Sequence, residues 1–165
     1  AAKLLGIDMG RKFTYTSRRE LPPEQVTKSI AAFRNPSKWP EWNSTAKSML
    51  ATKPESIDEG DHLAIFQVIK GSLIETKWKI KTIREGDFFC EIVLLGEGQS
   101  RNERAIAKGL KNLKISITFL HEKEGGIEVH ASCEASFVLS VFSRQINKFM
   151  QNQSKQLIDD LSRVQ

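Results

Sequence analysis

The stretch SVFSRQINKFMQNQSKQLIDDLSRV, residues 140–164, decides the fold because it predicts one long amphipathic helix near the end of the chain. Its apolar side chains recur at i, i+3, i+4 and i+7, which is the spacing of a single helix face. At about 1.5 Å per residue, this helix would be about 40 Å long. Such a stripe has to be buried against another apolar layer. The stripe comprises Phe142, Ile146, Phe149, Met150, Gln153, Leu157, Leu161 and Val164.

The second layer is predicted from segments in which apolar and polar residues alternate, as they do in strands with one buried face. In the clearest segment, Ile74, Thr76, Trp78 and Ile80 share one face while charged residues occupy the other. Short turns between consecutive strands favour antiparallel pairing. The seven predicted strands cover residues 12–20, 46–52, 62–70, 74–81, 88–95, 113–119 and 127–137.

Two short helices are predicted between the first and second strands. Pro23 suits the first turn of a helix, because a proline there loses no hydrogen bond, and apolar residues follow it at helical spacing up to Phe33. Asn35-Pro36 ends this helix. Residues 37–42 then form the second short helix. The expected fold class is therefore α+β.

A charged segment at residues 96–111 is predicted to be a long loop, with a short helix at residues 102–108. Loops of this length without secondary structure are uncommon in compact domains and are usually functional. We therefore expect this segment to act as a gate over a binding site.

The composition is that of an ordinary globular protein. Of the 165 residues, 39% are hydrophobic and 27% are charged, and no run approaches the ~18 apolar residues of a membrane-spanning helix. We expect a single domain at residues 12–165, preceded by an N-terminal extension at residues 1–11. The net charge of +5 comes from scattered basic residues with acids among them, a pattern that does not favour nucleic-acid binding.

The cysteines and histidines do not form a recognisable metal or cofactor site. Cys90 and Cys133 lie far apart in apolar segments, where a free cysteine behaves as a small hydrophobe. The sequence has no zinc-binding spacing, no catalytic triad and no nucleotide-binding glycine motif, so we predict no metal and no cofactor. Residues 1–12 lack the apolar core of a signal peptide, and we expect a reduced, cytoplasmic setting.

The predicted architecture leaves room for a ligand. A seven-stranded sheet twists and curls, and its concave face is wider than one helix of ~10 Å diameter. A single helix therefore covers the sheet incompletely. Either large side chains fill the remaining gap, or an apolar cavity suited to a small molecule remains.

Two segments stand out beside the two short helices: SRRELPPE at residues 17–24 and NPSKWPEWN at residues 35–43. They resemble the START/Bet v 1-like superfamily, and most closely its polyketide cyclase/dehydrase and lipid-transport group, in which a segment similar to residues 17–24 leads into the first helix. The resemblance implies a helix-grip fold, in which a curved antiparallel sheet wraps around the C-terminal helix and encloses an apolar cavity. The loop at residues 53–60 is not glycine-rich, unlike that of the plant allergen branch.

The resemblance implies binding of a hydrophobic ligand, because family members bind lipids, sterols, isoprenoid quinones, plant hormones or polyketides. Some members instead cyclise polyketides, and others act as protein partners such as chaperone activators. Ring-hydroxylating oxygenases share the fold and hold a metal, but His62, His121 and His130 lack the required arrangement with a carboxylate.

The ligand-binding candidates are the large side chains expected around the cavity, together with a few polar groups that would orient the ligand. Each aromatic has an alternative role as plain core packing. Tyr15 would reach the ligand with its hydroxyl or lie at the rim of the sheet. Gln153 would contact the ligand or a strand group, or it would lie at the edge of the apolar stripe. The candidates are Tyr15, Trp39, Trp42, Phe66, Trp78, Phe89, Glu91, Phe142, Phe149 and Gln153.

Glu91 and Tyr15 are also the candidates for acid–base catalysis. If Glu85-Gly86 forms a two-residue turn, Ile80 pairs with Glu91, and both face inward because directly opposite residues share a face. A longer turn or a bulge would instead turn Glu91 to solvent. The sequence thus favours hydrophobic ligand binding, with a cyclase or dehydratase in the same cavity and a protein-partner module with a plugged cavity as alternatives.

Overall fold

The computed structural model describes residues 10–165. Most of the N-terminal extension predicted at residues 1–11 therefore lies outside the described residues. The elements are β1 (Arg11–Glu20), α1 (Pro23–Phe33), η2 (Pro36–Lys38), α2 (Trp39–Trp42), β2 (Ala46–Ala51), β3 (His62–Ile69), β4 (Ser72–Glu85), β5 (Phe89–Arg101), β6 (Arg104–Ile106), β7 (Leu110–Leu120), β8 (Gly126–Ala135), η3 (Leu139–Phe142) and α3 (Ser143–Ser162).

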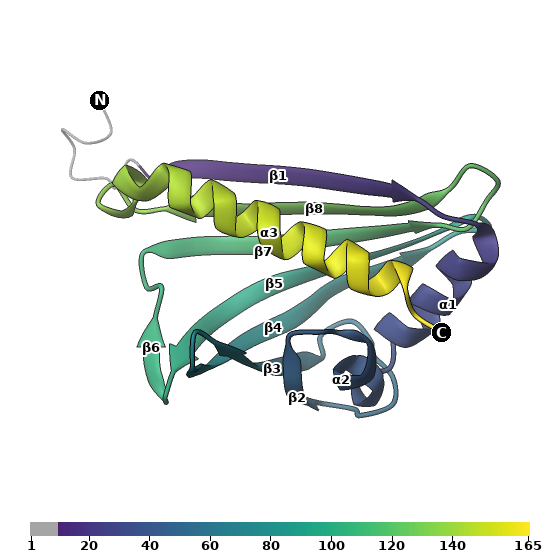
Figure 1. Cartoon of the computed structure of the whole chain (residues 1–165), viewed down its shortest axis with the longest axis horizontal. Coiled ribbons are helices and arrows are strands. Elements are labelled where there is room, and N and C mark those ends of the chain that lie inside the picture. The colour runs from purple at the N-terminus through teal and green to yellow at the C-terminus, as the bar shows by residue number, and fades with distance from the viewer. Residues whose placement is uncertain (1–9) are drawn as a thin grey trace.

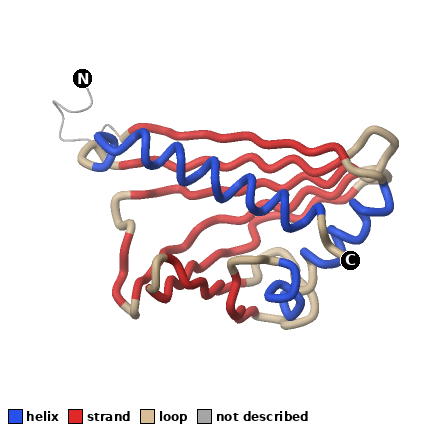
Figure 2. The backbone as a smooth tube through the Cα atoms, in the orientation of Figure 1, coloured by secondary structure: helices blue, strands red, loops and turns tan. Residues whose placement is uncertain are grey.

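The strands form one antiparallel sheet in the order β1-β8-β7-β5-β4-β3-β2, and β6 pairs with β5 outside this path. Figure 1 shows α3 lying across one face of this sheet, with α1 and α2 near its C-terminal end. Figure 2 shows α3 crossing in front of the strands, with α1 at their right-hand end. The predicted α+β helix-grip architecture is confirmed, and β6 is an additional short strand.

The sheet bends because several ladders lose register. The β4–β5 pairing shifts between Lys77 and Trp78 and again between Ile80 and Thr82, and the β7–β8 pairing shifts near residues 111–114. An extra residue in one strand of a pair bends that strand and increases its twist. The result is a curved sheet whose inward face includes the buried residues of β4.

The helices after β1 form as the prolines predicted. Pro23 occupies the first turn of α1, and Val26 and Phe33 are buried on its inner face. Ser29 is also buried, and its hydroxyl donates to the Leu161 carbonyl of α3 over 2.6 Å. This bond joins α1 to the C-terminal half of α3.

Helix α3 buries only part of the predicted stripe. Of that stripe, Met150 and Leu161 are buried, but Phe142 and Phe149 are 50% and 44% exposed, and Ile158, which the predicted stripe did not include, is buried as well. Phe142 belongs to the short helix η3, before the regular turns of α3 begin. The buried side of α3 therefore starts at Met150, later along the chain than the sequence periodicity indicates.

Two predicted connections are wrong. Glu85 pairs with Cys90 and the Gly86 amide donates to the Phe89 carbonyl, so Glu85 and Gly86 are part of the pairing between β4 and β5, and the turn lies after them in the chain. The predicted loop at residues 96–111, with its short helix, is largely a continuation of β5 and its hairpin with β6. Asn102 and Glu103 adopt φ values of 48° and 69°, the backbone of a tight two-residue hairpin turn.

The burial of α3 yields a first prediction. Ile158 is 2% exposed in the main hydrophobic cluster, so Ile158→Ala should lower the free energy of unfolding by about 2–5 kcal/mol, measured by urea denaturation. Asn152→Ala on the exposed side of the same helix should change it by less than about 0.5 kcal/mol. Similar effects at both positions would contradict this packing of α3.

Candidate ligand-binding cavity

A cavity of about 430 Å³ lies between α3 and the concave face of the sheet. It exists because α3 rests toward one side of the sheet, where Met150 packs with Phe13 of β1 and with Ala131 and Cys133 of β8. Figure 1 shows α3 running obliquely across the sheet, from the start of β1 toward α1, with β2 and β3 to the side of it. The space beside α3, over β3, β4, β5 and β7, is therefore left open.

Most of the cavity wall is apolar. The sheet contributes isoleucines and leucines from β3, β4, β5 and β7, while α3 contributes the side that faces them. The hydrophobic lining residues are Phe33, Trp39, Ile65, Ile69, Ile74, Trp78, Leu94, Ile106, Leu110, Leu113, Ile115, Ile117, Ala131, Cys133, Ile146, Phe149, Met150 and Leu157.

Amide and hydroxyl groups interrupt this wall on the strand side. The Gln67 amide donates to the Thr45 hydroxyl over 2.5 Å, and the Gln99 amide donates to the Thr76 hydroxyl over 3.0 Å. These four residues all line the cavity, and Gln153 faces it from α3. The cavity thus combines a large apolar surface with a few polar groups able to orient a ligand.

Asp160 is the only carboxylate among the described residues that line the cavity. It is 7% exposed and accepts hydrogen bonds from the Ser44 amide, the Ser44 hydroxyl and the Gln156 amide, each over 3.0 Å. A buried charge needs such partners. Asp160 therefore connects the segment before β2 to α3 and closes one part of the wall.

An aromatic cluster forms another part of the wall. The Trp39 ring lies 4.8 Å from Phe33 and 5.2 Å from Trp42, measured between centroids. The Trp39 indole nitrogen donates to the Phe33 carbonyl over 2.8 Å, and the Trp42 nitrogen donates to Ala32 over 3.2 Å. Trp39 borders the cavity, whereas Trp42 lies behind it.

The structure places four of the ten predicted ligand-binding residues at the cavity: Trp39, Trp78, Phe149 and Gln153. The remaining predicted residues do not border it, for reasons of strand register and helix position that differ between them. They are Tyr15, Trp42, Phe66, Phe89, Glu91 and Phe142.

Glu91 lies on the outer face of the sheet, as the alternative of a longer turn or a bulge predicts, and not on the inward face that a two-residue turn would give. Its strand neighbours Cys90 and Ile92 are buried in the core, and successive side chains alternate between faces. Glu91 pairs with Arg84 in place of Ile80, and the register shift between Ile80 and Thr82 moves the inward face of β4 from Ile80 to Ile83, which pairs with Ile92. The Glu91 carboxylate lies 3.8 Å from the Arg84 guanidinium.

Phe66 and Phe89 also point away from the cavity, because successive side chains of a strand alternate between faces. Ile65 and Gln67, on either side of Phe66, line the cavity, and Cys90, next to Phe89, is buried in the core. Tyr15 shares the inward face with Phe13 but packs in the cluster under α3. The helix covers Tyr15, so its hydroxyl does not reach the cavity.

Sequence reasoning missed Gln67, Thr76, Gln99, Arg101 and Asp160 as lining residues. The sequence did contain a signal for Thr76, because this polar residue shares the apolar face of its strand with Ile74, Trp78 and Ile80. Gln99 and Arg101 lie in the segment that was predicted to be a loop, and the side chains of a loop cannot be assigned to the inward or outward face of a sheet. Asp160 sits on the last turns of α3, at a position outside the apolar stripe.

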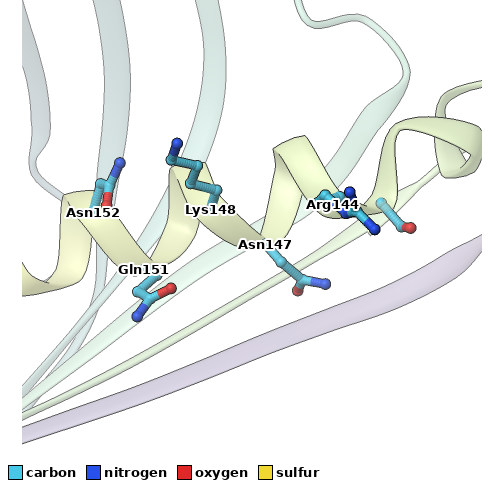
Figure 3. Close-up of a pocket in the computed structure, with 6 residues that line it drawn as sticks. Arg144, Asn147, Lys148, Gln151 and Asn152 are labelled. Carbon is cyan, nitrogen blue, oxygen red and sulfur yellow. The ribbon is translucent and has the colours of Figure 1, made fainter.

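A second hollow lies beside the N-terminal half of α3 (Figure 3). Its lining comes only from α3, since no other element supplies a side chain to it. One exposed helix face offers no enclosed surface, so this hollow is not a candidate site. The lining residues are Ser143, Arg144, Asn147, Lys148, Gln151 and Asn152.

Within residues 10–165, no group of three or more His, Cys, Asp or Glu side chains is placed to hold a metal ion. No helix in the same described part of the chain is long and apolar enough to cross a bilayer.

Solved structures share this fold over nearly the whole chain. A START superfamily protein from Mycobacterium smegmatis has a TM-score of 0.60 at 12% identity, covering 93% of this chain and 96% of its own. Ara h 8.0201 has a TM-score of 0.62 at 14% identity, covering 93% and 95%. Norcoclaurine synthase from Thalictrum flavum, in complex with dopamine and hydroxybenzaldehyde, has a TM-score of 0.62 at 10% identity, covering 93% and 86%.

No protein-family model matches the sequence, and no curated protein sequence matches it. At these low identities the structural comparisons establish the fold alone. The chain has the helix-grip fold of these proteins, which confirms the fold that the resemblance of residues 17–24 and 35–43 implied.

The Asp160 contacts yield a second prediction. Asp160→Ala leaves the Ser44 amide and hydroxyl without their acceptor, so it should lower the free energy of unfolding by about 1–3 kcal/mol in urea denaturation. The neighbouring Asp159 makes an exposed ion pair with Arg19, and Asp159→Ala should cost less than about 1 kcal/mol. A smaller loss at position 160 than at position 159 would contradict the assigned role.

The two cysteines yield a third prediction. Burial raises the pKa of the Cys133 thiol, and Glu134 raises it further; burial and then Glu85 raise the pKa of Cys90. Because the thiolate is the reactive form, both should react slowly with iodoacetamide at about pH 8 and faster only as the pH passes the raised pKa values. Mass spectrometry would measure the labelling, with urea-unfolded protein as control. Equal rates in the folded and unfolded chain would contradict this.

Proposed function

We propose that the protein binds a hydrophobic or amphipathic small molecule, such as a lipid, an isoprenoid or a polyketide, in the cavity beneath α3. The observation that carries the proposal is the hollow of about 430 Å³, which falls within the ~300–1,000 Å³ of small-molecule sites. Burying apolar ligand surface there would contribute about 25 cal/mol per Å². Transport of the bound molecule would use the same cavity.

Within this proposal, Trp39, Trp78 and Phe149 supply apolar contact, and Gln153 supplies an amide that orients the ligand. These residues lie on α2, β4 and α3, so they approach the cavity from different sides. Gln99 adds a second amide from the sheet, already aligned by its bond to Thr76. The arrangement supports a ligand with a large apolar body and a small number of polar atoms.

The structural neighbours support a small-molecule role without naming the ligand. One neighbour is described as a START superfamily protein, and the norcoclaurine synthase structure contains dopamine and hydroxybenzaldehyde. The same backbone arrangement can therefore accommodate small organic molecules. Fold alone does not fix function, so the proposal rests on the cavity of this chain.

The two alternative hypotheses receive less support. A cyclase or dehydratase needs an acid or base within reach of the substrate, but Glu91 and Tyr15 do not line the cavity. A protein-partner module predicted a plugged cavity, whereas the cavity here holds a substantial volume. We retain a cytoplasmic setting as part of the proposal, supported by the two unpaired cysteines Cys90 and Cys133.

The proposal has a direct test. Native mass spectrometry of the purified protein, followed by organic extraction, should reveal a bound lipid-like molecule, or uptake of one from a library of hydrophobic compounds. A protein that carries no ligand and takes up none would overturn the proposed function.

A fourth prediction locates binding in the cavity. Gln153 faces the cavity and its neighbour Asn152 faces solvent, so Gln153→Trp should fill the hollow while Asn152→Trp should not. Gln153→Trp should weaken binding of the fluorescent apolar probe N-phenyl-1-naphthylamine about tenfold or more, because the probe can then bury less apolar surface in the cavity. Asn152→Trp should leave the affinity for the probe within about twofold. Equal probe binding in both variants would place the binding elsewhere.

A further inference from the structure

The tip of the β5–β6 hairpin brings two arginines to the edge of the cavity. Arg101 lines the cavity, and Arg104 pairs directly with it across the hairpin. Directly opposite residues on antiparallel strands project from the same face. The next inward pair along this hairpin, Gln99 and Ile106, also lines the cavity. Strand register and cavity lining therefore agree that both guanidinium groups leave the sheet on the cavity side.

The hairpin turn holds this pair in register. Asn102 and Glu103, both with positive φ, form the two-residue connection, which fixes strand pairing on either side. The Asn102 amide also donates to the Leu73 carbonyl of β4 over 3.1 Å. The two arginines are thus placed by backbone hydrogen bonds on both sides of the turn.

No acidic side chain neutralises the two charges. Within residues 10–165, neither Arg101 nor Arg104 takes part in an ion pair, and Glu103 between them pairs with neither. Like charges directly opposite each other on a sheet are destabilising. Of the other arginines in the described part of the chain, three have carboxylate partners, Arg19 with Asp159, Arg34 with Glu85 and Arg84 with Glu91, and four have none.

We propose that Arg101 and Arg104 bind the anionic head group of an amphipathic ligand whose apolar part occupies the cavity. The inference rests on the proposed function and adds the charge and orientation of the ligand. Guanidinium groups bind carboxylates and phosphates through paired N–H bonds, and an anion between the two arginines would offset their repulsion. Ile74, which pairs with Arg101 and also lines the cavity, begins the apolar surface that receives the rest of the ligand.

A competition experiment tests this inference. Dodecanoate, dodecyl phosphate and the uncharged dodecanol would each displace N-phenyl-1-naphthylamine from the intact protein. At least one anionic compound should bind about tenfold more tightly than dodecanol, the effect of one charge-assisted hydrogen bond. A tighter dodecanoate would assign a carboxylate, and a tighter dodecyl phosphate would assign a phosphate.

Variants then localise the preference. The double variant Arg101→Gln/Arg104→Gln should lose the preference, so that the ratio of anion affinity to dodecanol affinity falls to about one. The matched control Lys28→Gln/Lys155→Gln removes the same charge from exposed positions away from the cavity and should keep the preference. A salt titration of the unchanged protein should weaken binding of the anion and leave dodecanol unaffected, because salt screens exposed charges.

The outcomes separate the two proposals. If dodecanol displaces the probe but neither anion binds more tightly, or if the double variant keeps the preference, the anion site is overturned and cavity binding stands. If the probe itself does not bind and none of the three compounds is taken up, the proposed function fails, and the head-group site fails with it.

Discussion

Helix α3 buries Met150 against Phe13, Ala131 and Cys133 on one side of the sheet, and this contact determines which strands the helix covers. The sheet is wider than the helix and curved by its register shifts, so one helix cannot cover all of it. Strands β3, β4, β5 and β7 form the concave wall of the cavity, together with Ala131 and Cys133 of β8. The position of α3 therefore creates both the hydrophobic core and the hollow.

The far end of α3 is held by polar contacts of a different kind. Ser29 donates to the Leu161 carbonyl, and Asp160 accepts from Ser44 and Gln156. These bonds join α3 to α1 and to the segment before β2, and they satisfy polar groups that would otherwise be costly to bury. The helix is thus fixed by apolar packing along its middle and by hydrogen bonds near its C-terminus.

Sequence reasoning succeeded where the controlling signal is local. The alternation around Trp78 reports one strand and its two faces, because side chains in a strand alternate every residue. Pro23 predicts the start of α1 for an equally local reason. The reasoning failed at the β4–β5 turn and at residues 96–111, where strand pairing depends on turn backbone conformation. Glu103 adopts a positive φ that is uncommon for a glutamate, so its sequence carried no hairpin signal.

The amino-acid sequence by itself determined the α+β class, the antiparallel strands and the closing amphipathic helix, because hydrophobic periodicity reports which side of each element is buried. Only the tertiary structure decided which inward residues meet the cavity. Tyr15 and Trp78 both face inward, yet Tyr15 packs in the cluster under α3 and Trp78 borders the hollow. The sideways position of a helix on a sheet follows from the sum of many contacts between distant segments, and periodicity along one strand does not contain that information.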